Sequence, residues 1–133
     1  MTRGSRIVAL VSLMAAVPVG AVGLGPLREE GIIDGPRKGF NLTLFNPYKE
    51  TTTFRAYAVG AEDSDEAPQL RVTILPDQTT LGSLQSRRLL VIANDLQPGE
   101  TYRFRLCAER SDQSSGVMIN ARVCSKLTAR RIG

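Results

Sequence analysis

The chain has 133 residues, a formal net charge of +4, 42% hydrophobic and 23% charged residues. That is the balance of one globular domain, and it excludes a disordered or collagen-like chain. Histidine is absent, so a Ser–His–Asp triad or a His metal site cannot be built. The two cysteines cannot supply the four ligands of a structural zinc site. Composition thus argues against an enzyme and favours a binding or structural module without a cofactor.

Residues 1–21 are predicted to be a signal peptide. Arg3 and Arg6 precede an uncharged stretch over 7–27, whose densest part, IVALVSLMAAVPV, has the length of a secretory apolar core. The small residues of the VGA motif place cleavage after Ala21, with a site after Gly23 as second choice. An uncleaved membrane anchor is the alternative, because the uncharged stretch can span a bilayer when tilted.

Cleavage changes the charge of the exported chain. Loss of Arg3 and Arg6 lowers the formal charge from +4 to about +2, too little to argue for nucleic-acid binding. We therefore expect a periplasmic or secreted protein that has no stable membrane span after cleavage.

The remaining chain shows short alternating apolar segments separated by turn residues, and no sustained helical periodicity. This pattern predicts an all-β, immunoglobulin-like Greek-key β-sandwich of about seven strands. Residues 22–38 form an N-terminal extension or contain the first strand, and 39–133 form the sandwich. The expected strands are near 31–34 and at 40–45, 52–59, 70–74, 88–93, 102–109 and 117–124.

The two cysteines are expected to pair in an oxidising compartment. Cys107 and Cys124 each lie on the polar face of their predicted strands. If these strands form a hairpin around 112–116, both sulfurs point to the same outer face and can lie opposite each other. A free redox pair is the alternative, although such pairs usually have the Cys-x-x-Cys spacing.

The segment LQPGETY predicts a tyrosine corner. Pro98 begins the turn, Leu96 tucks beneath it, and the Tyr102 hydroxyl bonds back to upstream backbone, as in Greek-key sandwiches. A buried tyrosine that merely follows a turn is the alternative.

Four segments occur in the order of a known family: NLTLFNP, FRAYAV, RVTILPDQTTLGSLQSRRLLVIANDL and GETYRFRLCAER. Together they resemble the N-terminal immunoglobulin-like domain of periplasmic pilus-assembly chaperones. The segment LQPGETYRFRLCA is also similar to the end of a fibronectin type III domain, although the tryptophan typical of that family is missing.

The chaperone resemblance implies donor-strand complementation, in which the chaperone lends a strand to an incomplete pilin. Such a strand needs free backbone groups and alternating apolar side chains. The row that fits is Val117, Ile119, Ala121 and Val123. The alternative is that this row packs into the protein's own core.

The resemblance also implies a basic pair that grips the pilin's C-terminal carboxylate. Arg37 or Lys38 could be its first member, but no residue matches the second. Because the sequence ends at Gly133, we expect a single-domain relative without the family's second domain.

Two charged clusters have simpler interpretations. Residues 62–66 are expected to form a solvated acidic loop rather than a calcium site. A polar outer sheet face accounts for most of the basic residues, although it could also dock an acidic partner. The basic residues are Arg87, Arg88, Arg103, Arg105, Arg122, Lys126, Arg130 and Arg131.

The favoured function is therefore a non-enzymatic, chaperone-like accessory protein of pilus or envelope assembly. It would bind other exported proteins, such as pilin-like or envelope subunits, through a sheet edge. The alternative is a structural subunit of a surface fibre or envelope complex.

Overall fold

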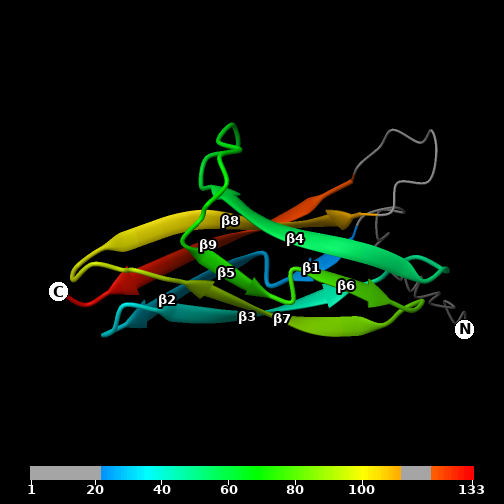
Figure 1. Ribbon diagram of the computed structural model, residues 1–133, viewed down its shortest axis with the longest axis horizontal. Coiled ribbons are helices and arrows are strands. Elements are labelled where there is room, and N and C mark those ends of the chain that lie inside the picture. Colours follow the sequence, from blue (N-terminus) through cyan, green and yellow to red (C-terminus); the bar gives the residue numbers. More distant parts are fainter. Residues whose placement is uncertain (1–21, 112–120) are drawn as a thin grey trace, which may run out of the picture.

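The computed structural model describes residues 22–111 and 121–133, in which all helix or sheet structure is β-strand. These residues form two facing sheets (Figure 1), which confirms the predicted all-β immunoglobulin-like sandwich. The strands are β1 (Gly23–Gly25), β2 (Arg28–Ile33), β3 (Lys38–Phe45), β4 (Thr52–Gly60), β5 (Val72–Leu75), β6 (Gln78–Leu81), β7 (Ser86–Ala93), β8 (Thr101–Arg110) and β9 (Val123–Arg131).

One sheet has the strand order β1-β3-β7-β5 and the other β2-β9-β8-β4-β6. We call the second one the β9 sheet. The N-terminal segment contributes one strand to each sheet, β1 to the first and β2 to the β9 sheet. Strand β1 is antiparallel to β3, and β2 is parallel to β9 over Arg28↔Lys126 to Ile33↔Arg131. Pro26 lies between the two strands and has no N–H for a ladder.

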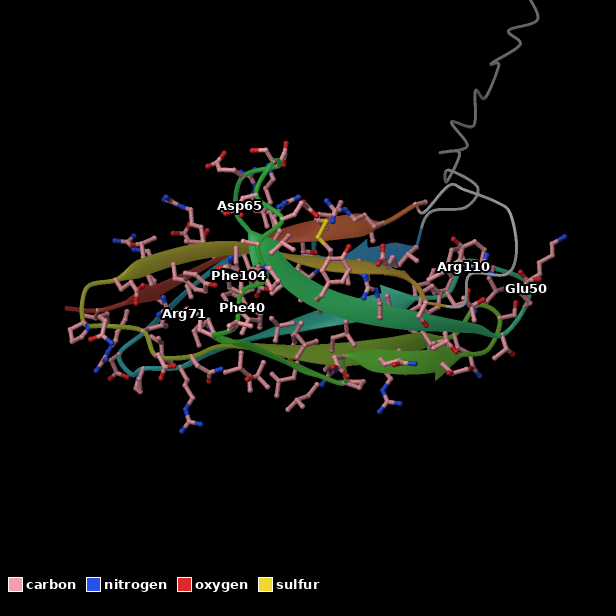
Figure 2. The ribbon with its side chains drawn as sticks, turned by 45° about the horizontal axis from the view of Figure 1, so that its top comes forward. Phe40, Glu50, Asp65, Arg71, Phe104 and Arg110 are labelled. Carbon is pink, nitrogen blue, oxygen red and sulfur yellow. A yellow bond between two sulfur atoms is a disulfide. The ribbon has the colours of Figure 1, made fainter. Side chains whose placement is uncertain are left out.

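Alternating apolar side chains from both sheets fill the core, as the strand patterning predicts. Phe40 of β3 and Phe104 of β8 meet edge to face across the sandwich, with ring centroids 6.3 Å apart (Figure 2). The other fully buried large side chains include Leu42, Leu44, Phe54, Leu89, Val91, Leu96, Leu106 and Leu127.

Two strand predictions need correction. The strand expected to end at Cys124 instead begins at Val123, although 117–120 lie outside the described residues. The polar segment SKLTARR continues this strand. Only alternate residues of a strand face the core, and here the apolar residues Leu127 and Ala129 occupy such positions and are buried. The prediction of about seven strands also missed β6, which follows β5 after Pro76, and β1, so the described residues form nine strands.

The turn before β8 has the predicted shape but a different hydrogen bond. Gly99 has a φ of 78° and the Glu100 N–H donates to the Gln97 carbonyl at 2.9 Å, as a Pro-Gly turn requires. Leu96 is fully buried. The Tyr102 hydroxyl, however, donates to the side-chain Oε1 of Gln69 at 2.6 Å, so the predicted bond to backbone is wrong.

Candidate functional site

The disulfide marks the outer face of the β9 sheet. Cys107 of β8 and Cys124 of β9 are register partners, with Cα atoms 4.0 Å apart and an S–S bond of 2.07 Å. The predicted pairing is thus confirmed. Cys107 alternates with core residues and lies on the outer face, yet it is fully buried. Something must therefore cover this face.

The cover is the loop between β4 and β5, which rises above the β9 sheet in Figure 1. Arg105, on the same face of β8, donates to the carbonyl of Gly60 at 2.8 Å and to that of Asp65 at 3.0 Å. Its side chain is only 5% exposed. Arg105, which we expected to be exposed, is instead buried, and its hydrogen bonds hold the loop in place.

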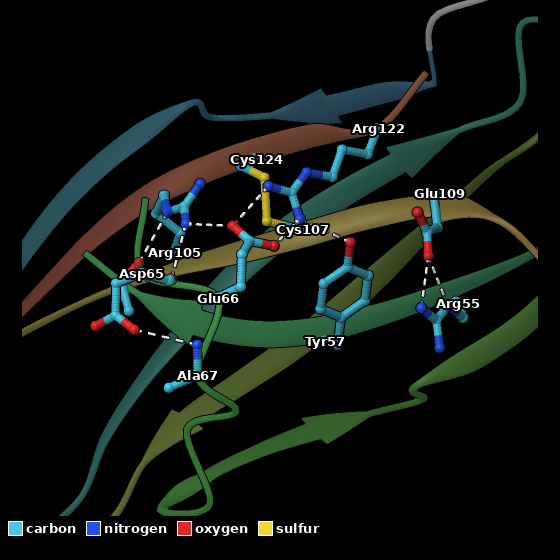
Figure 3. Close-up of polar contacts among 11 residues, drawn as sticks. Arg55, Tyr57, Asp65, Glu66, Ala67, Arg105, Cys107, Glu109, Arg122 and Cys124 are labelled. Atoms are coloured by element: carbon cyan, nitrogen blue, oxygen red, sulfur yellow. Dashed lines mark hydrogen bonds and ion pairs between the residues drawn. A yellow bond between two sulfur atoms is a disulfide. The ribbon is translucent and has the colours of Figure 1, made fainter. Parts of the chain in front are cut away.

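Glu66 of this loop joins two arginines (Figure 3). Arg122, just before β9, donates from Nη1 to Oε1 at 2.6 Å and from Nη2 to Oε2 at 2.8 Å. Nη2 of Arg105 donates to the same Oε2 at 2.9 Å. We call Glu66, Arg105 and Arg122 the outer-face clamp. Residues 62–66 are exposed, as expected of a solvated loop, but the Glu66 carboxylate is also bound by two arginines.

The electrostatics of the outer-face clamp favour its charged form. The hydrogen bonds from Arg122 and then Arg105 lower the pKa of Glu66 from 4.5 to about 2. The bonds to Glu66 and to the Tyr57 hydroxyl, 3.1 Å away, raise the pKa of Arg122 above its ordinary value. The carboxylate of Glu66 and the guanidinium of Arg122 are therefore charged at every physiological pH.

The first residues of β9 lie at an open sheet edge. On one side β9 pairs with β8, but on the other the ladder with β2 starts only at Lys126, whose N–H donates to the Leu27 carbonyl. No strand among residues 22–111 and 121–133 pairs with Val123 or Cys124 on that side. Ser125 is fully buried, and its hydroxyl donates to the Pro26 carbonyl at 2.7 Å. We call Val123 and Cys124 the β9 edge.

The register fixes which backbone groups this edge offers. The short Cα–Cα distance of Cys107 and Cys124 is that of a non-hydrogen-bonded antiparallel pair. The N–H and C=O of Cys124 therefore point away from β8, toward the open side. Those of Val123, the register partner of Ala108, point toward β8. A further strand could pair with the β9 edge at Cys124.

The predicted donor row is only partly described. Val117 and Ile119 lie outside the described residues. Ala121 and Val123 are half-buried, and Val123 packs against the core. Their role in partner binding stays a prediction.

A groove of about 410 Å³ lies next to the β9 edge on the outer face. Its charged lining is mixed: the basic residues are Arg28 and Lys126, which are register partners, and Arg103 on β8, and the acidic ones are Glu29, Glu30 and Glu62. In the described part of the chain none of the three basic residues has an ion pair, in contrast to Arg105 and Arg122. Sequence analysis missed Arg28 because only the β2–β9 pairing brings it to Lys126.

The predicted carboxylate anchor lies elsewhere. Lys38 begins β3, opposite Ala93 of β7, and its ammonium lies 5.6 Å from the ring centroid of Phe40. Arg37 precedes it in the link from β2. Neither lines the groove of Arg28 and Lys126, so their role also stays a prediction.

Two further properties concern cofactors and membranes. Within the described ranges, no three metal-ligating side chains cluster. Nor does that part of the chain contain a helix of the length and apolarity needed to cross a bilayer.

Comparison with solved structures confirms the likeness to pilus chaperones at the level of fold. The E. coli chaperone DraB superposes with a TM-score of 0.65 and 18% identity, over 84% of this chain and 55% of that chain. The SafB chaperone solved with the SafA pilin of Salmonella enterica gives 0.65 and 18%, over 87% and 57%. The chain thus spans little more than half the length of these proteins.

A third match covers both chains almost fully. The PapD-like domain 7 of human CEP192 gives a TM-score of 0.62 at 15% identity, over 98% of each chain. No family model matches the sequence, and no curated protein matches it either. At these sequence identities the comparisons support the fold alone, and the function has to be argued from the candidate site.

Proposed function

We propose that the chain is a non-enzymatic, exported binding module that acts as a chaperone-like accessory protein in pilus or envelope assembly. The observation that carries this proposal is the β9 edge, an open strand edge in a domain with the fold of pilus chaperones. Its partners are other exported proteins, pilin-like or envelope subunits, and no cofactor takes part.

The mechanism is strand addition. An extended segment of the partner pairs with the outward N–H and C=O of Cys124. Ala121 and Val123 supply small apolar side chains on alternate positions, which the partner covers. Main-chain hydrogen bonds provide affinity, and the apolar side chains provide register.

The groove beside this edge supplies a second element of recognition. Glu29, Glu30 and Glu62 line the same groove, so its charge is mixed. Within it, Arg28 and Lys126 are adjacent, exposed and without ion pairs in the described residues, and this pair suits a carboxylate of the partner. The pair is better placed for this than Arg37 or Lys38, because Lys126 lies two residues after Cys124.

Site-specific photocross-linking in the cells that produce the protein tests this proposal. A photoreactive residue at Ala121 should link to an exported chain, and one at Arg87, exposed on the other sheet, should not. Ala121→Glu should reduce recovery of the same partner by at least tenfold while the melting temperature is unchanged. Equal cross-linking from both positions, or none from Ala121, would contradict strand addition.

The second candidate is a structural subunit of a surface fibre or envelope complex. The full-length match to a PapD-like domain of CEP192 favours it, because the fold also serves as one domain of a larger human protein. A structural subunit should stay with its partner through a chase with excess unlabelled protein, whereas a chaperone should exchange.

A further inference from the structure

Arg122 is held more firmly than its position predicts. It precedes the first residue of β9 and lies outside any described strand. Its guanidinium nevertheless makes two bonds to Glu66 and one to the Tyr57 hydroxyl, all on the outer face of the β9 sheet (Figure 3). These contacts extend the order of β9 toward Ala121.

Arg122 and Cys124 are alternate residues that are both fixed on the same face. Cys124 is tied to β8 through the disulfide, and Arg122 to the β4–β5 loop through Glu66. Two anchors at i and i+2 fix the rotation of an extended chain about its axis. Ala121 and Val123 are then directed to the opposite side.

The charge of Glu66 is essential to this arrangement. Arg105 and Arg122 donate to the same oxygen, Oε2, so the two guanidinium groups are close together. A neutral residue at position 66 would leave two cations facing each other. Arg105 is buried and held by Gly60 and Asp65, so Arg122 is the one that would move away.

We infer that Glu66 is the positioning residue of the partner-binding edge. By holding Arg122 on the outer face it keeps Ala121 and Val123 extended, in one rotational setting, before a partner arrives. Pre-ordering of this kind lowers the entropic cost of strand addition. The inference rests on the proposed function.

The experiment compares Glu66→Gln with Asp63→Asn, a matched neutralisation in the same loop at an exposed residue. The free, disulfide-bonded full chain is labelled with ¹⁵N. In Glu66→Gln the Val123 amide should exchange at least tenfold faster, and the order parameter at Arg122 should fall below about 0.6. Asp63→Asn should behave as the wild type. Unchanged exchange in Glu66→Gln would overturn the inference.

Partner binding supplies the second readout. Cross-linking yield from Ala121 should fall at least fivefold in Glu66→Gln and stay at the wild-type level in Asp63→Asn. If exchange accelerates while the yield holds, the positioning role is overturned and the proposed function stands. If the wild-type protein itself gives no cross-link from Ala121, the proposed function fails, which is visible before any variant is compared.

A second variant keeps the inference testable if Glu66→Gln fails to fold. Arg122→Gln leaves the Arg105–Glu66 pair intact and should give the same acceleration at Val123 and the same loss of yield. At Val123 and in cross-linking yield the double variant should be no worse than Glu66→Gln alone, since both single variants remove the same Arg122–Glu66 interaction. Additive losses would overturn the inference.

Discussion

Asn46 is a buried polar residue whose side chain holds backbone segments together at one end of the sandwich. Its side chain is fully buried at the end of β3. The Nδ2 group donates to the carbonyls of Glu50 and Leu81, each at 3.0 Å, and Oδ1 accepts from the Tyr48 N–H at 2.9 Å. One amide therefore satisfies backbone groups from two separate loops, and buried backbone groups seldom lack a partner.

Replacing this amide should be costly. Asn46→Leu leaves those buried groups without partners and places a larger side chain in a fully buried site, so we expect the free energy of unfolding to fall by about 2–4 kcal/mol. Urea denaturation measures it. Asn41→Leu, at an exposed position of the same strand, is the matched control and should change stability by less than about 0.5 kcal/mol. Similar values for both variants would show that the Asn46 bonds contribute little.

Strands β8 and β9 are joined by the disulfide as well as by their ladder. Their linked cysteines are 17 residues apart in sequence. Closing a loop of that size restricts the unfolded chain, so Cys107→Ser/Cys124→Ser should lose about 2–4 kcal/mol of stability. Denaturation of the variant and of the oxidised wild type measures the difference. A loss below about 1 kcal/mol would mean that strain in the native bond offsets the entropic gain.

The same two strands show what sequence can and cannot predict. The β8 pattern is regular: Phe104, Leu106 and Ala108 face the core, and so the outward position of Cys107 followed from local alternation. In β9 the inward residues are few and small, and the charged residues between them obscured the strand. Its register was still partly predictable, because a disulfide cannot form if one cysteine points inward.

The candidate site was less predictable for a related reason. The acidic loop and Arg122 are separated by 56 residues, and nothing local indicates that Glu66 bonds to it. The pairing of Arg28 with Lys126 likewise exists only because β2 lies parallel to β9. Local patterning predicts which face a side chain occupies, but tertiary contacts decide which partner it meets.

At the scale of the whole molecule, two carboxylates make the free energy of unfolding depend on pH in the acidic range. Arg122 and Arg105 lower the pKa of Glu66 to about 2, and Arg71 with the Gln97 N–H does the same for Glu100. Since both values lie below the ordinary 4.5, their contribution is complete above that pH. It is lost as the pH falls from about 4.5 toward 2.

We therefore expect the double variant Glu66→Gln/Glu100→Gln to be less stable than the wild type at pH 7. The gap should close as the pH falls through that window, because protonation removes the same interactions from the wild type. Urea denaturation at pH 7, 5, 4 and 2.5 tests this. Parallel pH curves for the two proteins would show that these carboxylates do not govern acid stability.

The N-terminus of the exported protein is the remaining prediction at this scale. Cleavage after Ala21 would leave Val22 as the first residue, and in the folded domain Val22 is only 3% exposed. Mass spectrometry of the exported chain should find an N-terminus at or close to Val22. Intact Met1 in a membrane fraction would instead support the uncleaved anchor.

The pairing of β2 with β9 also sets when the domain can finish folding. Pro26 and Ser125, which are hydrogen-bonded at 2.7 Å, are 99 residues apart in sequence. A chain that emerges with its N-terminus first therefore carries β2 unpaired until residues 126–131 have also emerged. During that interval the strand edges of the β9 sheet are open to other chains and to proteases. The domain is thus most in need of protection while it is still emerging.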